Sequence, residues 1–418
     1  MMRRSNSGAP PRSGDSLSSN GSYQPRRKKS RGKSNGSLIR FLLLIVFLLA
    51  TLDLVLFWRK HHPTTTASSH FTSFQLSHAE SQQLHEFVEQ QPPIPATGTD
   101  DDTTDVDVDV DVDADKEPVY EILRQANIDP KTLDYDTRRQ LPTWSTIQRL
   151  FGTEPRIYGL DTCHRFREIT DPSLTFLAMA GTFNSGTNLL ASLMIQNCQI
   201  EERMRVYGEK QKGMRWQVKW GKHTPPKYRE THMTTTDKDV PLEYTLPLIT
   251  IRDPYNWMQS MCRHPYEAHW THSKTNCPHV WDEPSGRTSV VHVDYRHTME
   301  RHDSLPGMWN DWYNAYMEVE YPRVFVRMED LIFYGKNVTE TLCQCGGGVP
   351  RQRRFKHIAS SAKLGTAQHG NDKTSLLSAI IRYGTEDGRL KGMTPMDLQM
   401  TRKLLDPNLM HIFNYSYA

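Results

Sequence analysis

A glycine-containing turn between an apolar run and a helical pattern is the clearest chemical signal in the sequence. The run LTFLAMAG begins at Leu174 and is typical of a buried parallel strand. Gly181 and Gly186 allow a sharp turn, and the amides that begin the following helix, LLASLMIQNC, attract an anion. A plain strand-to-helix connection is the alternative interpretation. The predicted phosphate loop comprises Thr182, Phe183, Asn184, Ser185, Gly186, Thr187 and Asn188.

The residues after Gly186 limit the kind of nucleotide. A Walker A loop requires Lys and then Ser or Thr after its second glycine, whereas Thr187 and Asn188 stand here. The lysine that binds β and γ phosphates is missing, which argues against an ATP-driven kinase or motor. A nucleotide with a shorter phosphate chain and no Mg²⁺ bridge is therefore favoured.

A second strand-to-helix segment, LPLITIRDPYNWMQSMCRHP, carries an arginine at the end of its strand. The apolar strand 246–251 delivers Arg252, and Asp253 and Pro254 are typical of an N-cap and a first helical position. Ser260 lies about two helical turns further on and can converge with Arg252 on one terminal phosphate. Ligands of open α/β sheets bind at this end of the strands. An exposed arginine paired with Asp253 is the alternative.

Together, GTFNSGTN and RDPYNWMQSM resemble the two cofactor-binding signatures of the sulfotransferase family. In that family the first loop holds the 5′-phosphosulfate of 3′-phosphoadenosine 5′-phosphosulfate (PAPS), and the second supplies an Arg and a Ser to its 3′-phosphate. The resemblance implies that residues 185–188 belong to the 5′ site, and that Arg252 and Ser260 belong to the 3′ site. It extends over about residues 174–331, because SLPGMWNDWYNAYME and VFVRMEDL are also similar to the family.

The resemblance also suggests catalytic groups. The stretch WQVKWGKHTPP is similar to the family's Lys and His segment after the second strand. It makes His223 the expected general base, and Lys222 or Lys219 the expected positive charge near the sulfuryl group. A His223 that merely caps the turn before Pro225 is the alternative, and Glu209 is a less favoured base.

The loop departs from the family at Asn184, where a Lys or Arg is usual. That basic residue helps to stabilise the bridging oxygen as its bond to sulfur breaks. Asn184 donates a hydrogen bond but brings no charge. Either Lys219 or Lys222 reaches in from the neighbouring strand, or the enzyme is slow or inactive.

Cysteines and histidines cluster between residues 262 and 279 and raise the possibility of a zinc site. Their spacing matches no common closed zinc site, and we favour a Cys262–Cys277 disulfide with no metal. Cys343 and Cys345 are expected to be structural, with their partners left open. The cluster comprises Cys262, His264, His269, His272, Cys277 and His279.

Two further segments are assigned to structure rather than to chemistry. An aromatic stripe at helical spacing favours core packing over an acceptor surface. The acidic and basic residues after the strand VFV are expected to form local ion pairs. These sets are Trp309, Trp312, Tyr313 and Tyr316, and then Arg327, Glu329 and Asp330.

These motifs require an α/β domain, which we predict as a P-loop-type parallel sheet flanked by helices over residues 119–418. The preceding segments are predicted as a basic cytosolic tail (1–37), a transmembrane signal-anchor helix (38–58) and a disordered acidic stem (59–118). The run FLLLIVFLLATLDLVLFW is long enough to span a bilayer and lacks a signal-peptidase site.

Several features favour a type II Golgi membrane protein with a lumenal domain. The predicted span is short, which suits thin early secretory membranes. All six cysteines follow it, and so do the sequons at Asn337 and Asn414.

The expected function is PAPS-dependent sulfuryl transfer to a hydroxyl of a glycan, a glycoprotein or a small secretory acceptor, without nucleic acid. A metal-dependent glycosyltransferase that uses the repeated Asp-Val-Asp of the stem is one alternative. A catalytically silent nucleotide-binding protein of the same fold is the other.

Overall fold

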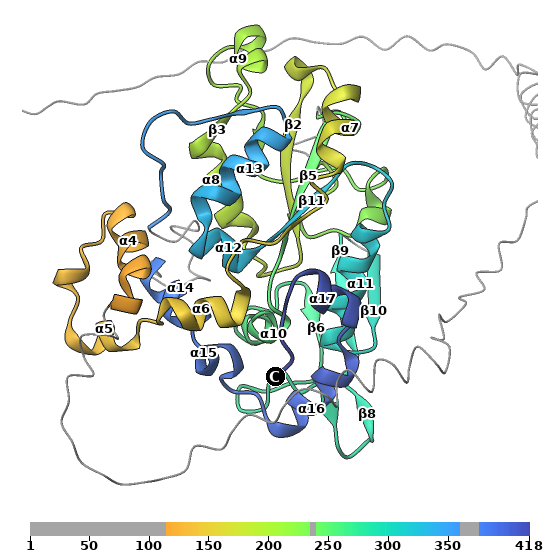
Figure 1. Cartoon of the computed structure of the whole chain (residues 1–418). Helices are drawn as coiled ribbons and strands as arrows, with labels where there is room; N and C mark the ends of the chain where they lie inside the picture. Colours follow the sequence, from red (N-terminus) through yellow and green to blue (C-terminus); the bar gives the residue numbers. More distant parts are fainter. Residues whose placement is uncertain (1–113, 235–239, 297, 360–375) are drawn as a thin grey trace, which may run out of the picture. The chain divides into compact units, whose positions relative to one another are not determined.

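A five-stranded sheet forms the centre of the computed structural model, which describes residues 114–418 except 235–239, 297 and 360–375 (Figure 1). Its strand order is β1-β11-β5-β2-β4. The two central strands pair in parallel and are buried along their whole length. The strands are β1 (Ile157–Tyr158), β2 (Phe176–Gly181), β4 (Met214–Arg215), β5 (Thr245–Ile251) and β11 (Val324–Arg327).

The continuous apolar runs of β2 and β5 reflect burial on both faces of the sheet. Successive side chains of a strand point to opposite faces. Leu177 and Met179 therefore belong to one hydrophobic cluster and Ala178 and Ala180 to the other. This burial confirms the two strands predicted from the sequence.

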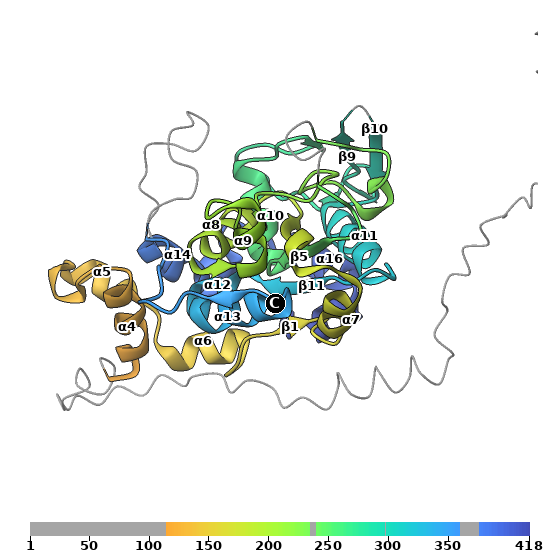
Figure 2. The same cartoon turned by 90° about the horizontal axis from the view of Figure 1, so that it is seen from above.

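Helices cover both faces of the sheet. The cluster that contains Leu177 is closed by α8 and α13, and the cluster that contains Ala178 by α10 and α11. Both views place α8 and α13 across the sheet from α11 (Figures 1 and 2). The helices are α4 (Glu117–Gln125), α5 (Tyr135–Gln140), α6 (Trp144–Phe151), α7 (Thr162–Ile169), α8 (Thr187–Asn197), α9 (Glu201–Tyr207), α10 (Pro254–Arg263), α11 (Leu305–Met317), α12 (Met328–Phe333), α13 (Gly335–Cys345), α14 (Leu376–Tyr383), α15 (Glu386–Leu390), α16 (Pro395–Leu404) and α17 (Pro407–Ile412).

Helix starts follow the capping residues of the sequence. Asp253 accepts a hydrogen bond from the Asn256 amide, and Pro254 is the first helical residue, as predicted for α10. Ser304 accepts one from the Gly307 amide at the start of α11. The helix predicted after the strand 246–251 and the helix predicted for the aromatic stripe are therefore confirmed.

Smaller strands complete the described fold. A three-stranded antiparallel sheet with order β10-β9-β6 follows α10 in the chain, and two short pairs, β12-β3 and β7-β8, lie elsewhere. These strands are β3 (Cys198–Gln199), β6 (Ala268–His269), β7 (Trp281–Asp282), β8 (Arg287–Thr288), β9 (Val291–Tyr295), β10 (Thr298–His302) and β12 (Val349–Pro350), and the 3₁₀ turns are Pro130–Thr132, Pro172–Leu174 and Pro226–Tyr228.

The predicted parallel sheet is corrected to a mixed sheet. Strand β1 runs antiparallel to β11, with Ile157 opposite Val326, while β11, β5, β2 and β4 run parallel to one another. A two-residue edge strand carries too little hydrophobic pattern to be recognised in a sequence.

The predicted membrane anchor is not supported. No helix in the described part of the chain has both the length and the apolar character needed to cross a bilayer. The span predicted at 38–58 lies outside the described residues, as do the tail and the stem up to residue 113. In the described part of the chain, α4 starts at Glu117 and Lys116 is buried.

All six cysteines are paired. The Cys262–Cys277 disulfide is confirmed, and the two remaining bonds join Cys163 to Cys345 and Cys198 to Cys343. The second and third of these bonds tie α13 to α7 and to the end of α8. Three disulfides indicate an oxidising compartment, as for a secreted or lumenal protein.

Candidate functional site

The glycine turn lies between β2 and α8, as predicted. A Cβ atom at Gly181 would lie 2.4 Å from Ser185 Oγ and 2.5 Å from Thr250 Oγ1, so a larger residue has no room there. Gly186, the N-cap of α8, has φ of 94°, and Asn184 has φ of 58°. Glycine and asparagine tolerate this left-handed region. The chain therefore reverses tightly just before the first turn of α8.

A buried hydrogen-bond network supports the loop from beneath. Ser185 Oγ donates to Thr182 O at 2.8 Å and lies 2.9 Å from Thr250 Oγ1. Thr182 Oγ1 is 2.9 Å from the Tyr313 hydroxyl, which also donates to Thr250 O. These side chains hold the loop, so the loop offers a ligand its backbone amides rather than the Ser185 hydroxyl.

The two predicted phosphate motifs meet at Asn184. Arg252 Nη1 donates to Asn184 O at 2.9 Å. Asn184 Nδ2 donates to His264 O at 2.8 Å and to Ser260 O at 3.3 Å, at the end of α10. The Asn184 side chain therefore connects the loop to α10 and does not reach toward a ligand.

No family model, curated protein or solved structure matches the chain. The sulfotransferase resemblance consequently stays a prediction based on the two motifs. In the structure, Arg263, Arg382 and Tyr383 join the residues of the two motifs, although neither resemblance included them.

A cationic cluster surrounds Ser260. Arg263 Nη2 donates to Ser260 Oγ at 2.6 Å, and the Arg252 guanidinium lies 4.5 Å above the Tyr383 ring. Desolvation, followed by the charge of Arg382, lowers the pKa of Arg263 to about 10. Among the described residues, no carboxylate forms an ion pair with any of the three arginines. The cluster therefore has an excess of positive charge that suits an anion.

The Tyr383 phenol responds to the same charges. Burial alone would raise its pKa, but Arg252, Arg382 and Arg263 together lower it below the ordinary value. The three arginines therefore stabilise a negative charge on an oxygen at the position of the Tyr383 hydroxyl. A phosphate oxygen would gain from the same field.

Two buried nitrogens of Arg252 are left without partners. Arg252 is 2% exposed, and its Nε and Nη2 atoms form no hydrogen bond with the described protein atoms. A buried guanidinium with unsatisfied donors is unfavourable unless another group accepts from it. A phosphate is an acceptor of the right charge and geometry, so these residues fit the terminal phosphate of a nucleotide.

Lys222 lies at the other end of the candidate site. Its Nζ donates to Asn188 Oδ1 at 2.6 Å, in the first turn of α8, and lies 4.5 Å from the centre of the Trp216 ring. Lys222 O also accepts from the Gly181 amide at 2.8 Å. The lysine is thereby held against the predicted phosphate loop from the neighbouring segment. This is one of the two arrangements predicted to replace the basic residue that is absent at Asn184.

His223 faces the same loop. Its Nδ1 lies 2.8 Å from Gly181 O, so the proton on this ring is expected at Nδ1, which makes Nε2 the basic nitrogen. The imidazole packs 4.9 Å from the Phe183 ring, and Trp312 Nε1 donates to His223 O at 2.9 Å. The His223 ring is thus oriented by its contact with the glycine turn, in addition to its position before Pro225.

Two other predicted residues, Lys219 and Glu209, have no side-chain bond to the loop in the described part of the chain. The Lys219 ammonium forms no hydrogen bond or ion pair with the described residues, and Glu209 is exposed beyond α9. The cysteines of the 262–279 cluster are in a disulfide and supply no thiolate to a metal. The core assignment of the aromatic stripe is confirmed, since Trp309, Trp312, Tyr313 and Tyr316 are all buried.

A buried carboxylate fixes the start of α10 next to Arg252. Glu329 Oε1 accepts from the Asp253 amide at 3.1 Å, and Oε2 accepts from the Tyr415 hydroxyl at 3.0 Å. Asp253 Oδ2 in turn accepts from Arg389 Nε at 2.8 Å. The predicted local ion pair after β11 is confirmed for Arg327 and Asp330. Glu329 instead supports the start of α10.

Glu329 makes stability depend on pH. Desolvation, followed by repulsion from Asp253, raises its pKa to about 7 from 4.5. The folded state then binds more protons than the unfolded state between these values, so stability is highest below about 4.5 and falls as the pH rises to about 7. We expect the free energy of unfolding of Glu329→Gln, relative to the wild type, to increase by about 1–3 kcal/mol from pH 4.5 to pH 8.

Urea denaturation across that pH range measures the difference. The matched control is Glu267→Gln, which removes an exposed carboxylate and should leave the pH slope unchanged. A Glu329→Gln protein with the wild-type slope would show that Glu329 is ionised when buried.

Sequence reasoning missed part of the cationic cluster. Arg263 lies three residues after Ser260 on α10, so helical spacing contained a signal for it. Arg382 and Tyr383 come from α14, more than a hundred residues further along the chain, and no local pattern connects them to Arg252.

Proposed function

We propose that the chain is a sulfotransferase that passes the sulfuryl group of PAPS to an acceptor hydroxyl. The observation that carries the proposal is the buried Arg252, whose guanidinium contacts the phosphate loop and keeps two nitrogens without protein partners. One phosphate at these nitrogens and another at the first turn of α8 match a nucleotide that is phosphorylated at both ends.

The residues around Arg252 support a terminal phosphate at the 3′ position. Ser260 and Arg263 are hydrogen-bonded to each other and lie on the helix that Arg252 precedes. Asn184 links that helix to the phosphate loop. A phosphate bound there would satisfy the Arg252 donors and neutralise part of the surplus charge.

The proposed step is an in-line displacement at sulfur. The acceptor oxygen forms a bond to sulfur while the bond between sulfur and the 5′-phosphate oxygen breaks. The hydroxyl proton passes to His223 Nε2, and the electron pair of the broken bond stays on the departing bisphosphate. Lys222 and the first amides of α8 balance the charge that develops on the phosphate.

The acceptor class follows from the compartment. The three disulfides require an oxidising environment. We therefore propose a hydroxyl of a glycan, a glycoprotein or a small secretory molecule as the acceptor, and the Golgi lumen as the site of the reaction.

Transfer of labelled sulfate tests the proposal directly. Full-length protein from eukaryotic cells is incubated with labelled PAPS and a panel of lumenal glycans and glycoproteins, with excess adenosine 3′,5′-bisphosphate as competitor. We expect label on an acceptor and its loss with competitor. Binding of the bisphosphate without transfer would instead identify a silent nucleotide-binding protein, and absence of both would refute the proposed site.

Lys222 and Lys219 are distinguished by one pair of variants. Lys222→Ala is expected to lower kcat about 10²-fold, because it removes a charge held at the first turn of α8. Lys219→Ala removes the same charge from a side chain without such contacts and should change kcat less than threefold or so. Equal effects in steady-state assays would contradict the assignment of Lys222.

A further inference from the structure

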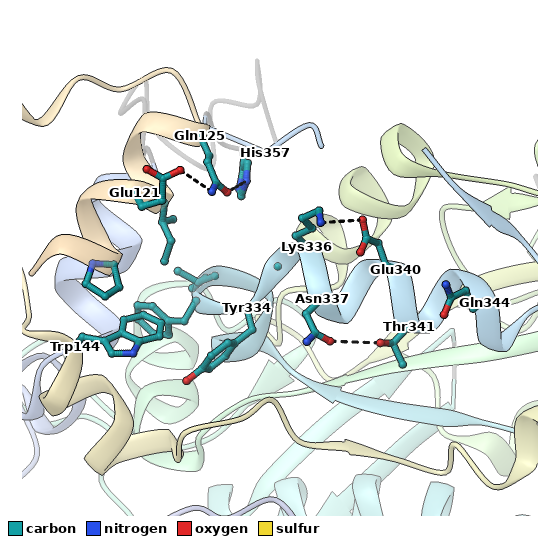
Figure 3. A pocket seen from close by; sticks show the side chains of 15 residues that line it. Glu121, Gln125, Trp144, Tyr334, Lys336, Asn337, Glu340, Thr341, Gln344 and His357 are labelled. Carbon is teal, nitrogen blue, oxygen red and sulfur yellow. Dashed lines mark hydrogen bonds and ion pairs between the residues drawn. The ribbon is translucent and has the colours of Figure 1, made fainter. Parts of the chain in front are cut away.

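A cavity of 590 Å³ lies between α4, α6, α12 and α13 (Figure 3). Its floor is apolar and aromatic, with Trp144 and Tyr334 in edge contact at 5.5 Å. Its rim carries polar side chains, among them Glu121, Lys336 and His357. This volume and mixed lining are typical of a site for a small amphipathic ligand.

The sequon asparagine belongs to this cavity. Asn337 is exposed on the first turn of α13 and lines the hollow. Its Oδ1 is directed to the Thr341 hydroxyl at 3.4 Å, so Nδ2 lies on the other side of the amide, toward Tyr334 in Figure 3. A group attached to Nδ2 would therefore start at the lining of the cavity.

We propose that Asn337 carries an N-linked glycan whose first sugars occupy this cavity. The inference rests on the disulfide-bonded compartment and on the Asn337-Val-Thr339 sequon, and it does not depend on the proposed enzymatic activity. Sugar rings pack their apolar faces on aromatic side chains and hydrogen-bond through their hydroxyls, which matches the Trp144 and Tyr334 floor and the polar rim.

The order of events follows from the burial of Thr339. This residue is fully buried, and its hydroxyl donates to Gly335 O at 2.6 Å. The hydroxyl that the sequon needs is thus inaccessible once α13 has packed, so attachment occurs while the chain is still unfolded. In that step the Asn337 nitrogen loses a proton and bonds to the sugar C1 of a lipid-linked oligosaccharide, and the lipid pyrophosphate leaves with the electrons of its bond to C1.

Glycosidase release from native protein tests both the modification and its position. The full chain is produced in the secretory pathway of eukaryotic cells, and the glycan is located by peptide mass mapping. We expect a glycan at Asn337, its loss in Asn337→Gln and Thr339→Ala, and its retention in Thr339→Ser. Native protein should release it at least about tenfold more slowly than denatured protein, because the linkage lies in the cavity.

Two measurements separate a seated glycan from one that points into solvent. Trp144→Ala removes part of the floor and should bring the native release rate to that of denatured protein. In Asn337→Gln, amide hydrogen exchange of residues 117–125 should accelerate, whereas Asn414→Gln should leave it unchanged. An unmodified Asn337, or a glycan released at equal rates in native and denatured protein with unchanged exchange in α4, would overturn the proposal.

Discussion

Replacing Arg252 with alanine is expected to weaken binding of adenosine 3′,5′-bisphosphate by roughly 10²–10³-fold. The guanidinium is almost fully buried and keeps Nε and Nη2 for an acceptor. Its removal would therefore delete the charge-assisted hydrogen bonds proposed between these nitrogens and the phosphate. Isothermal titration calorimetry of the full-length protein measures the change.

Two further variants control for folding and for net charge. Arg402→Ala removes an exposed arginine on α16 and should leave the affinity within about twofold. Arg252→Lys keeps the charge but loses the planar fork, so an intermediate affinity is expected. If Arg252→Ala, with an unchanged melting temperature, bound the bisphosphate as tightly as the wild type, the phosphate site would be elsewhere.

Replacing His223 with alanine is expected to lower kcat by about 10²–10⁴-fold while the affinity for the bisphosphate stays the same. The imidazole is oriented by its Nδ1 contact with Gly181 O and by the Phe183 ring, and in the proposed step its Nε2 takes the acceptor proton. Single-turnover transfer of labelled sulfate measures the chemical step, and calorimetry measures binding.

His292→Ala is the matched control, because His292 is exposed on β9 and lies outside the candidate site. It should transfer sulfate at the wild-type rate. Loss of bisphosphate binding in His223→Ala, rather than loss of transfer, would make this histidine part of the support of the loop. A transfer rate equal to that of His292→Ala would remove it from the mechanism.

Local signals predicted the elements that carry the motifs. The apolar runs of β2 and β5 are unbroken, and Asp253 with Pro254 determines where α10 begins. The Cys262–Cys277 bond spans only 15 residues and was predicted within one segment. In each case the residues that determine the feature are close to one another in the sequence.

Features that depend on distant residues were not predictable. The other two disulfides join cysteines 182 and 145 residues apart, and sequence alone leaves such pairings open. Tyr383 reaches Arg252 from α14, a helix that packs against α12 and α15. The direction of the Asn184 amide was also missed, because the carbonyls that it contacts belong to the end of another helix.

The tie formed by Asn184 limits how this loop can be altered. A lysine at position 184 would supply the basic residue that is usual there in the family that the motifs resemble. Its ammonium has to reach the ligand to act there, and it then abandons the two carbonyls at the end of α10 that the amide now satisfies. The same substitution that adds a charge would therefore remove the bonds that join this loop to the end of α10.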